Sequence, residues 1–257
     1  AAPSAARAKL NQGLAPKDSR SVQLDSVSMG SLVSGVAAYF NPSNAIGKQY
    51  TEGMVARTGM ADWYENERIW TLPNSADVTV TTAAAAAVTD GGTNITLASV
   101  ANATVEGMVF TVAGVYDCHP ETKQSLGYLQ PFVVVTGGTT TQEVSPPTYL
   151  TGAKKNVCSS SGADLATTDF NGTSVAVTFT GAASTNYVQP LMYHKEAFQF
   201  VTADLPLMDD AHKCVRRSQD GLSLRVWQGS DIRNDELLMR IDMLYGMAAL
   251  RPEWACR

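Results

Sequence analysis

The sequence predicts an α+β protein in which a body of mixed helices and strands is interrupted by a separate β-rich module. Three observations lead to this prediction: a drop in charge over the middle of the chain, helical periodicity near its start, and a long alternation of apolar and polar residues at its end. The chain has 257 residues, of which 44% are hydrophobic and 17% charged. This composition supports a packed core and argues against wholesale disorder.

The middle stretch, residues 76–190, differs in composition from its flanks. It holds 11 charged residues in 115 positions, against 32 in the other 142. Turn signals such as Asp90-Gly91 separate short runs that favour β structure. The runs are DVTVTT, TNITLAS, GMVFTVAGV, PFVVVT, TQEVS and TSVAVTFT. Their number and spacing predict a small antiparallel β-barrel or sandwich, inserted into the body.

Helix signals lie ahead of this module. Apolar residues in SMGSLVSGVAAYFNP recur with the helical spacing i, i+3, i+4, i+7. Ser28 is the expected N-cap, and residues 41–42, Asn-Pro, are expected to end the helix. A shorter helix is predicted over PSAARAKLNQG, with Gly13 as its C-terminal signal. RSVQLD and ERIWTLP before the module, and AFQFVTADL after it, are predicted strands.

The most unusual stretch is the terminal NDELLMRIDMLYGMAALRPEWACR, in which every odd position from Leu237 to Ala249 is apolar. A helix is the alternative, because Leu, Met and Ala favour one, but Gly246 inside a helix would cost about 1 kcal/mol. We predict one continuous strand over residues 237–250, paired with GLSLRVWQ through the polar loop GSDIRND. At about 3.3 Å per residue such a strand spans roughly 45 Å. Its apolar face is expected to be buried.

No catalytic motif is recognisable in the sequence. It lacks the phosphate-binding loops GxGxxG and GxxxxGK[ST], the zinc motif HExxH and the nucleophile motif GxSxG. His194-Lys195-Glu196 lacks the i, i+4 spacing that a helical metal site needs. We therefore predict no enzyme activity, no cofactor and no metal.

The charge pattern argues against a nucleic-acid-binding protein, and the cysteine pattern argues against a protein held together by disulfides. The net charge is −5 and no Lys/Arg run exceeds a pair, which argues against a surface that grips nucleic acid. The four cysteines are scattered, so reduced thiols are predicted rather than a disulfide framework. No apolar run is long enough to predict a membrane span.

Two stretches are candidate contact regions between subunits. ADWYENERIW contributes aromatic residues of the kind enriched where subunits meet. DDAHKCVRR carries both signs of charge and is interpreted as a solvated or intersubunit loop rather than a Cys/His catalytic site. The candidate interface residues are Trp63, Tyr64, Asp209, Asp210, Arg216 and Arg217.

The order of five segments resembles the major coat proteins of short-tailed bacteriophages, a family with the Hong Kong 97-type capsid fold and an inserted β domain. The segments are APKDSRSVQLDSVSMGSLVSGVAAYFN, GMVARTGMADWYENERIWTLP, EGMVFTVAGVYDCHPETKQSLGYLQPFVV, LMYHKEAFQFVTADLPL and GLSLRVWQGSDIRNDELLMRIDMLYGMAALRPEWACR. The last is the most specific, because such proteins tend to close with a long strand, Arg-Pro-Glu and one more apolar turn.

The resemblance implies a division into domains. Residues 1–75 and 191–228 correspond to the axial domain, residues 76–190 to the inserted β-barrel domain, and residues 229–257 to C-terminal strands of the peripheral domain. The family's N-terminal arm, extended loop and long spine helix are expected to be absent from this chain, which opens AAPSAAR.

The implied function is structural. The chain would be a major capsid subunit that self-assembles, as pentamers and hexamers, into an icosahedral shell around double-stranded DNA. Scaffolding and portal proteins are the implied further partners, and the DNA would lie nearby without specific contact. The implied location is the virion, after synthesis in the cytoplasm of the host bacterium. The alternative is a β-rich carbohydrate-binding or adhesin-like module, with Trp63, Tyr64, Trp70 or Trp227 as a sugar platform.

Overall fold

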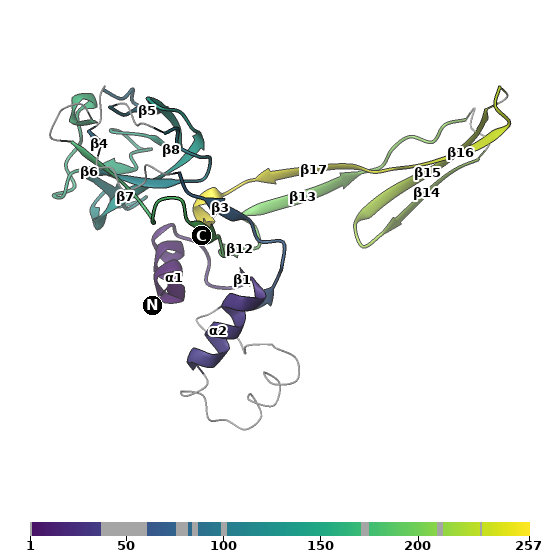
Figure 1. Cartoon of the computed structure of the whole chain (residues 1–257), viewed down its shortest axis with the longest axis horizontal. Helices are drawn as coiled ribbons and strands as arrows, with labels where there is room; N and C mark the ends of the chain where they lie inside the picture. Colours follow the sequence, from purple (N-terminus) through teal and green to yellow (C-terminus); the bar gives the residue numbers. More distant parts are fainter. Residues whose placement is uncertain are drawn as a thin grey trace. The chain divides into compact units, whose positions relative to one another are not determined.

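The computed structural model shows a mostly β protein with two α-helices in its described part (Figure 1). No helix of that part is both long and apolar enough to cross a membrane. The chain divides into a first unit, Ala1–Met192 with Cys256–Arg257, and a second unit, Tyr193–Ala255. The structure describes residues 2–36, 61–75, 82–83, 87–98, 102–170, 175–209, 213–231 and 233–257.

The helices are α1 (Ala2–Gln12) and α2 (Ser26–Val36), with short 3-10 turns η1 (Thr167–Phe170) and η2 (Pro252–Trp254). The strands up to residue 194 are β1 (Arg20–Leu24), β2 (Asp62–Glu65), β3 (Thr71–Pro73), β4 (Thr82–Ala83), β5 (Gly92–Thr96), β6 (Val109–Cys118), β7 (Ser125–Thr136), β8 (Thr141–Thr148), β9 (Val157–Cys158), β10 (Ala176–Phe179), β11 (Asn186–Val188) and β12 (Leu191–His194). The later strands are β13 (Phe198–Ala203), β14 (Lys213–Gln219), β15 (Leu222–Asp231), β16 (Glu236–Asp242), β17 (Leu244–Ala249) and β18 (Ala255–Cys256).

Helix α1 confirms the first predicted helix and ends just before Gly13. The left-handed residue after it is Leu14, with φ of 59°. The Ala15 N–H donates to the Leu10 carbonyl at 3.0 Å and the Leu14 N–H to the Asn11 carbonyl at 3.1 Å, which together form a Schellman motif. Leu10 and Ala15 are both buried. The two hydrogen bonds hold Leu14 in a conformation that glycine usually occupies.

Helix α2 confirms the second predicted helix, but the expected N-cap, Ser28, is wrong. The helix begins at Ser26, and Asp25 caps it, because its Oδ2 accepts a hydrogen bond from the Ser28 N–H at 3.2 Å. Hydrogen bonding to Ser28 lowers the pKa of Asp25. The expected end at residues 41–42 lies outside the described residues.

Strand β1 confirms the prediction for RSVQLD and lies in a four-stranded sheet ordered β18-β12-β1-β2. It pairs in parallel with β2, Val22 opposite Trp63, and both side chains are buried. Arg20, also fully buried, donates to the carbonyls of Ala15 at 2.7 Å and Pro16 at 2.6 Å, which ties the strand to the end of α1. ERIWTLP is extended only at its end, where β3 pairs with β11.

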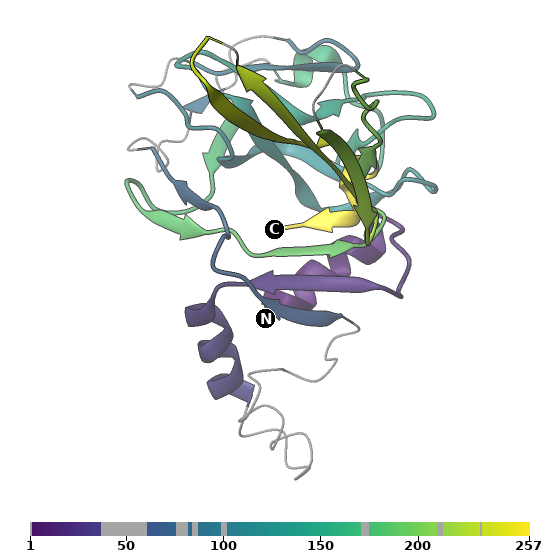
Figure 2. The ribbon, with the colours of Figure 1, turned by 90° about the vertical axis from the view of Figure 1, so that its right-hand side faces the viewer.

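The middle stretch forms an antiparallel sheet ordered β4-β10-β6-β7-β8-β5, with β9 paired to β6. Several of its strands are labelled in Figure 1, and they are drawn in teal to green in Figure 2. Five of the six predicted β runs contain a strand of this sheet, whereas DVTVTT lies almost wholly outside the described residues. The sheet has its own core, centred on Phe110, whose ring lies 5.9 Å from that of Phe132 and 5.5 Å from that of Phe179. Leu72 is the core member from outside residues 88–179.

The second unit contains the predicted strands from AFQFVTADL and GLSLRVWQ, as β13 and β15. The terminal run is extended, so the choice of strand over helix is confirmed. One continuous strand is wrong, however, because the run is split at Met243 into two strands with different partners. β16 pairs with β15 in a sheet ordered β14-β15-β16, and β17 pairs with β13 in a two-stranded ribbon (Figure 1).

A candidate subunit interface

The three-stranded sheet β14-β15-β16 has one apolar face. The register places Val215 and Ile241 on either side of Val226, so these side chains project from the same face. Alternation along each strand then assigns the remaining large apolar residues. The apolar face consists of Val215, Leu222, Leu224, Val226, Leu237, Met239 and Ile241.

This apolar face is open to solvent. Leu237 is 66% exposed, and Met239 and Ile241 are 62% exposed each. The expected burial of the odd-numbered terminal residues is therefore wrong for the chain by itself. The physical reason is that the described part of the second unit places no second layer over this face. Single exposed apolar residues are ordinary, but a contiguous row of them marks a surface that another polypeptide covers.

The opposite face of the sheet is more polar, and it is covered around Arg225 but exposed at Leu238 and Arg240. Residues 204–209, here called the strap, follow β13 and lie against it. The Arg225 guanidinium donates to the Pro206 carbonyl of the strap at 2.7 Å, and it pairs with Asp242 at 2.6 Å. Arg216 also reaches the strap, through an ion pair with Asp204 at 3.6 Å. The strap thus shields the part of the polar face around Arg225, whereas the apolar face is exposed along most of its length.

Asp242 is the acidic centre of the polar face. Its two carboxylate oxygens accept from different arginines, Arg225 on β15 and Arg240 on its own strand, at 2.6 and 2.5 Å. The hydrogen bond from Arg225, and then that from Arg240, lowers the pKa of Asp242. Only 7% of the Arg225 side chain and 11% of the Asp242 side chain is exposed, so this is a shielded ion pair that holds β15, β16 and the strap together.

The β13–β17 ribbon is also apolar and uncovered. Phe200 lies opposite Met247, Thr202 lies opposite Tyr245, and the Phe200 and Tyr245 rings stack at 5.8 Å. Phe200, Tyr245 and Met247 are all exposed. A two-stranded ribbon has no interior and is marginally stable by itself. The second unit therefore has two apolar surfaces for which its described residues supply no layer.

The candidate interface residues lie in separate elements. Trp63 and Tyr64 are neighbours on β2 in the first unit, where Trp63 is buried and Tyr64 is 55% exposed. Asp209 is exposed at the end of the strap, and Asp210 lies outside the described residues.

Arg216 and Arg217 point to opposite faces of β14. Arg216 lies on the polar face and is partly exposed, and Arg217 lies opposite Leu224 on the apolar side. Alternation in LSLRV and ELLMRI could have identified the apolar face from sequence. Alternation could not show that this face is exposed and not buried under a second layer of the protein.

The four aromatic residues that could have formed a sugar platform differ in how far their rings are exposed. Trp63 is buried, and the Trp227 indole nitrogen is buried with no hydrogen-bond partner. Trp70 is half exposed, but its ring packs over the backbone of Gly107. Only Tyr64 of these presents an open ring, and one ring makes a poor sugar platform.

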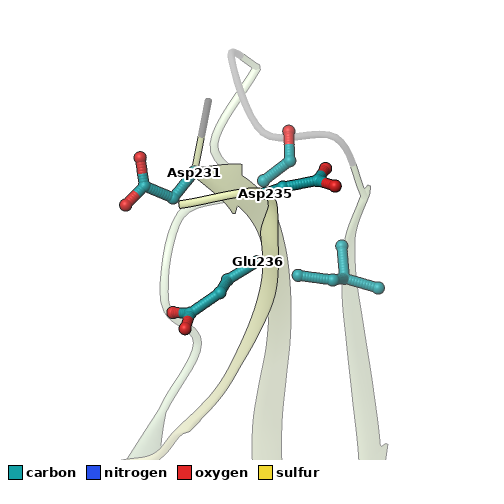
Figure 3. Close-up of a pocket in the computed structure, with 5 residues that line it drawn as sticks. Asp231, Asp235 and Glu236 are labelled. Carbon is teal, nitrogen blue, oxygen red and sulfur yellow. The ribbon is translucent and has the colours of Figure 1, made fainter. Parts of the chain in front are cut away.

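The turn between β15 and β16 forms an acidic hollow of about 370 Å³. Its carboxylates are those of Asp231, Asp235 and Glu236, and they point in different directions rather than converging (Figure 3). Asp231 already accepts hydrogen bonds from the Arg233 N–H and the Asn234 side chain, each at 2.9 Å. The described residues contain no group of three or more His, Cys, Asp or Glu side chains that could hold a metal ion.

The four cysteines are free. Cys118 and Cys158 are buried on the neighbouring strands β6 and β9, where burial and the adjacent thiol raise the pKa of Cys118 to about 11. This thiol is therefore protonated at neutral pH and unreactive as a nucleophile.

Comparison with known protein families identifies a matching family. The family model described as P22 coat protein, gene protein 5, matches residues 48–256. The match includes the middle β sheet and all of the second unit. A search of curated proteins found no match.

Proposed function

Since the chain belongs to the P22 coat protein family and is a phage major capsid protein, we propose that it self-assembles into an icosahedral shell that encloses the phage's double-stranded DNA. Proteins of this family are structural components of the virion capsid. The observation that carries the proposal is the open apolar face of β14-β15-β16, together with the uncovered β13–β17 ribbon.

The energetics of this surface suit a shell. Burying a large apolar side chain contributes about 1.5–3 kcal/mol, so covering the exposed half of seven such side chains contributes on the order of 7 kcal/mol before the costs of association. A contact that nets about 4 kcal/mol has only millimolar affinity. Repeated around each subunit, such contacts make a closed lattice stable while single misplaced subunits can still dissociate. In the assembled shell, further coat-protein polypeptide would cover the apolar face.

At the level of the fold, we propose the Hong Kong 97-type architecture. The axial domain would comprise residues 1–75 and 191–228, the inserted β domain residues 76–190, and the C-terminal strands of the peripheral domain residues 229–257. The separate core of the middle sheet and the two extended strands of the terminal run support this division.

The proposed partners are further copies of the chain in pentamers and hexamers, with scaffolding and portal proteins during assembly in the host cytoplasm. The DNA would be enclosed without specific contact, in keeping with the net charge of −5. Tyr64, Asp209 and Arg217 are proposed contact residues because they are exposed. Arg216 is exposed as well and is a proposed contact residue on the other face of β14. Trp63 is buried and would act by supporting its neighbour Tyr64 on β2.

Replacement of two apolar-face residues tests this function. We expect Met239→Ser combined with Ile241→Ser to raise the concentration needed for shell formation by tenfold or more, because two exposed anchors of the interface are lost. Shells would be counted by negative-stain imaging and light scattering of the complete coat protein.

Val27→Ser is the matched control, because it removes an exposed apolar side chain from α2 in the first unit. It should leave the shell yield unchanged. Circular dichroism would establish that both variants keep their strands. Shells of the double variant at the wild-type concentration would contradict the role given to the apolar face.

A further inference from the structure

Strand β16 is an outer strand of its sheet, and it has no bulge or single-sign row of charges that would oppose pairing with a second copy. In the described sheet it pairs with β15 alone, so its other edge presents unpaired backbone groups. The opposite outer strand, β14, carries Lys213, Arg216 and Arg217, charges of the kind that block edge-to-edge pairing. β16 also carries three charges, but they are of both signs, so they can pair with those of a second β16. Its other side chains are exposed and apolar, and its register with β15 runs without a bulge.

We propose that β16 pairs edge to edge with β16 of a second copy of this chain, antiparallel and about a two-fold axis, in the register centred on Leu238. This inference rests on the proposed function, which requires contacts between copies, and it adds the strand and the register of one such contact. The two three-stranded sheets would then form one continuous sheet.

Symmetry limits the possible registers. A two-fold axis perpendicular to the sheet must place one residue opposite its own copy, so each register is identified by its central residue. Such an axis also keeps each face on its own side, so the two apolar faces join. With Leu238 at the centre, Glu236 lies opposite the partner's Arg240, and Arg240 opposite the partner's Glu236. Leu237 then lies opposite the partner's Met239 on the apolar side.

Charge selects this register from its neighbours. Centring on Met239 would place Glu236 opposite the partner's Asp242, and centring on Arg240 would place two arginines opposite each other. Both arrangements oppose like charges, which destabilises cross-strand pairs. Centring on Leu237 pairs Glu236 with a leucine and forms no ion pair. Centring on Ile241 would pair Arg240 with the partner's Asp242, but it aligns only residues 240–242 of β16 and takes Asp242 from its shielded pair with Arg225. Among the registers that align at least five residues of β16, only the one centred on Leu238 gives two reciprocal ion pairs.

Both charged groups are available for this contact. Glu236 is exposed and has no ion-pair partner among the described residues. Arg240 is 69% exposed and uses its Nε on Asp242, which leaves its terminal nitrogens for a second carboxylate. Glu236, Leu238 and Arg240 share one face of β16 by alternation. The ion pairs would therefore flank the central leucine pair.

A charge swap in the complete coat protein tests the register. Glu236→Arg alone or Arg240→Glu alone opposes two pairs of like charges across the two-fold axis, and should weaken the contact about tenfold. The double variant Glu236→Arg/Arg240→Glu restores both ion pairs and should return the contact to near wild-type strength. A double variant as weak as the sum of the single ones would overturn the register.

Crosslinking measures the same contact directly. Leu238→Cys places two thiols opposite each other, and mild oxidation of assembled shells should give a disulfide-linked dimer on non-reducing gels. Leu222→Cys lies at the far end of β15, away from β16, and should give none. The parent protein reports any background from its own cysteines. The charge-swap variants are tested in the Leu238→Cys background, where each single swap should reduce the dimer yield and the double swap restore it.

The outcomes separate the two proposals. Shells that form without a crosslink at position 238 would overturn strand pairing and leave the coat function standing. Failure of the wild-type protein to form any shell would overturn the proposed function itself. If a charge variant fails to fold, the presence or absence of the Leu238→Cys crosslink in the wild-type charge background still decides the proposal.

Discussion

Gly107 is a position at which the backbone and a neighbouring ring both exclude a side chain. Its φ is +87°, in the region that glycine favours, and the ring of Trp70 occupies the space into which a Cβ would project. The Arg257 guanidinium donates to the Gly107 carbonyl. This residue thus joins the loop before β6, the aromatic residue before β3 and the end of the chain.

We expect Gly107→Ala to lower the free energy of unfolding by about 3 kcal/mol or more, since it adds a steric clash to the backbone strain. Gly114→Ala is the control, because Gly114 has φ of +82° and no heavy atom lies within 4 Å of the place that an alanine methyl group would take there. It should cost only about 1–2 kcal/mol. Denaturant unfolding of both variants measures the difference, and equal losses would show that Trp70 does not constrain this position.

At the scale of elements, helix α1 is joined to the β6–β7 hairpin by a polar cluster. Lys9 pairs with Asp117 at 2.6 Å, and the Tyr128 hydroxyl lies 2.8 Å from both the Asp117 carboxylate and the Gln12 side-chain oxygen. Burial, together with the hydrogen bond to Asp117 and its charge, raises the pKa of Tyr128. The protonated hydroxyl is therefore part of the contact that holds α1.

A raised pKa for Tyr128 has a definite consequence at high pH. The folded state keeps a proton that the unfolded state loses near pH 10, so this stabilisation is present below about pH 10 and falls as the pH rises above it. Tyr128→Phe removes the titrating group. We expect the stability difference between wild type and this variant, about 1 kcal/mol at neutral pH, to shrink above pH 10. Urea unfolding from pH 7 to 11 measures it, and a constant difference would contradict the assignment.

The Arg225–Asp242 pair gives the opposite pH dependence in the second unit. The pKa of Asp242 is lowered in the folded state, so its stabilisation is present above the ordinary aspartate pKa near 4 and is lost as the pH falls below it. Asp242→Asn should therefore destabilise the second unit at pH 7 and approach the wild type in stability toward pH 3. Hydrogen exchange of β15 and β16 amides against pH reports on this unit alone. A loss that is the same at pH 3 and pH 7 would show that the carboxylate charge is not the cause.

At the scale of the whole molecule, apolar side chains are distributed unevenly between the two units. The middle sheet of the first unit encloses a core that includes Phe110, Phe132 and Phe170, each fully buried. The second unit instead exposes most of the large apolar residues of β13 to β17. A chain that leaves so much apolar surface uncovered is better suited to a lattice than to a monomer.

Much of the fold could be predicted from sequence because its signals are local. Runs of β-favouring residues between turn signals identified most strands of the middle sheet, and alternation identified the extended terminal run. Helical spacing identified α2, and Gly13 indicated where α1 ends. The N-cap of α2 was predicted wrongly, because two residues near the start of the helix could both have capped it. Asp25 caps α2 in place of Ser28 because its carboxylate reaches the Ser28 N–H, and both residues are ordinary N-cap types.

Composition and alternation are properties of neighbouring residues, and from them alone it follows that the chain is rich in β structure, that residues 237–249 are extended and that the protein resembles a phage coat protein. The division of the terminal run at Met243 between two partner strands, and the exposure of the apolar face of β14-β15-β16 beside a polar face shielded around Arg225, became visible only in the folded chain. Those outcomes depend on which distant strands pair and on where the strap lies. No pattern within a single strand carries that information.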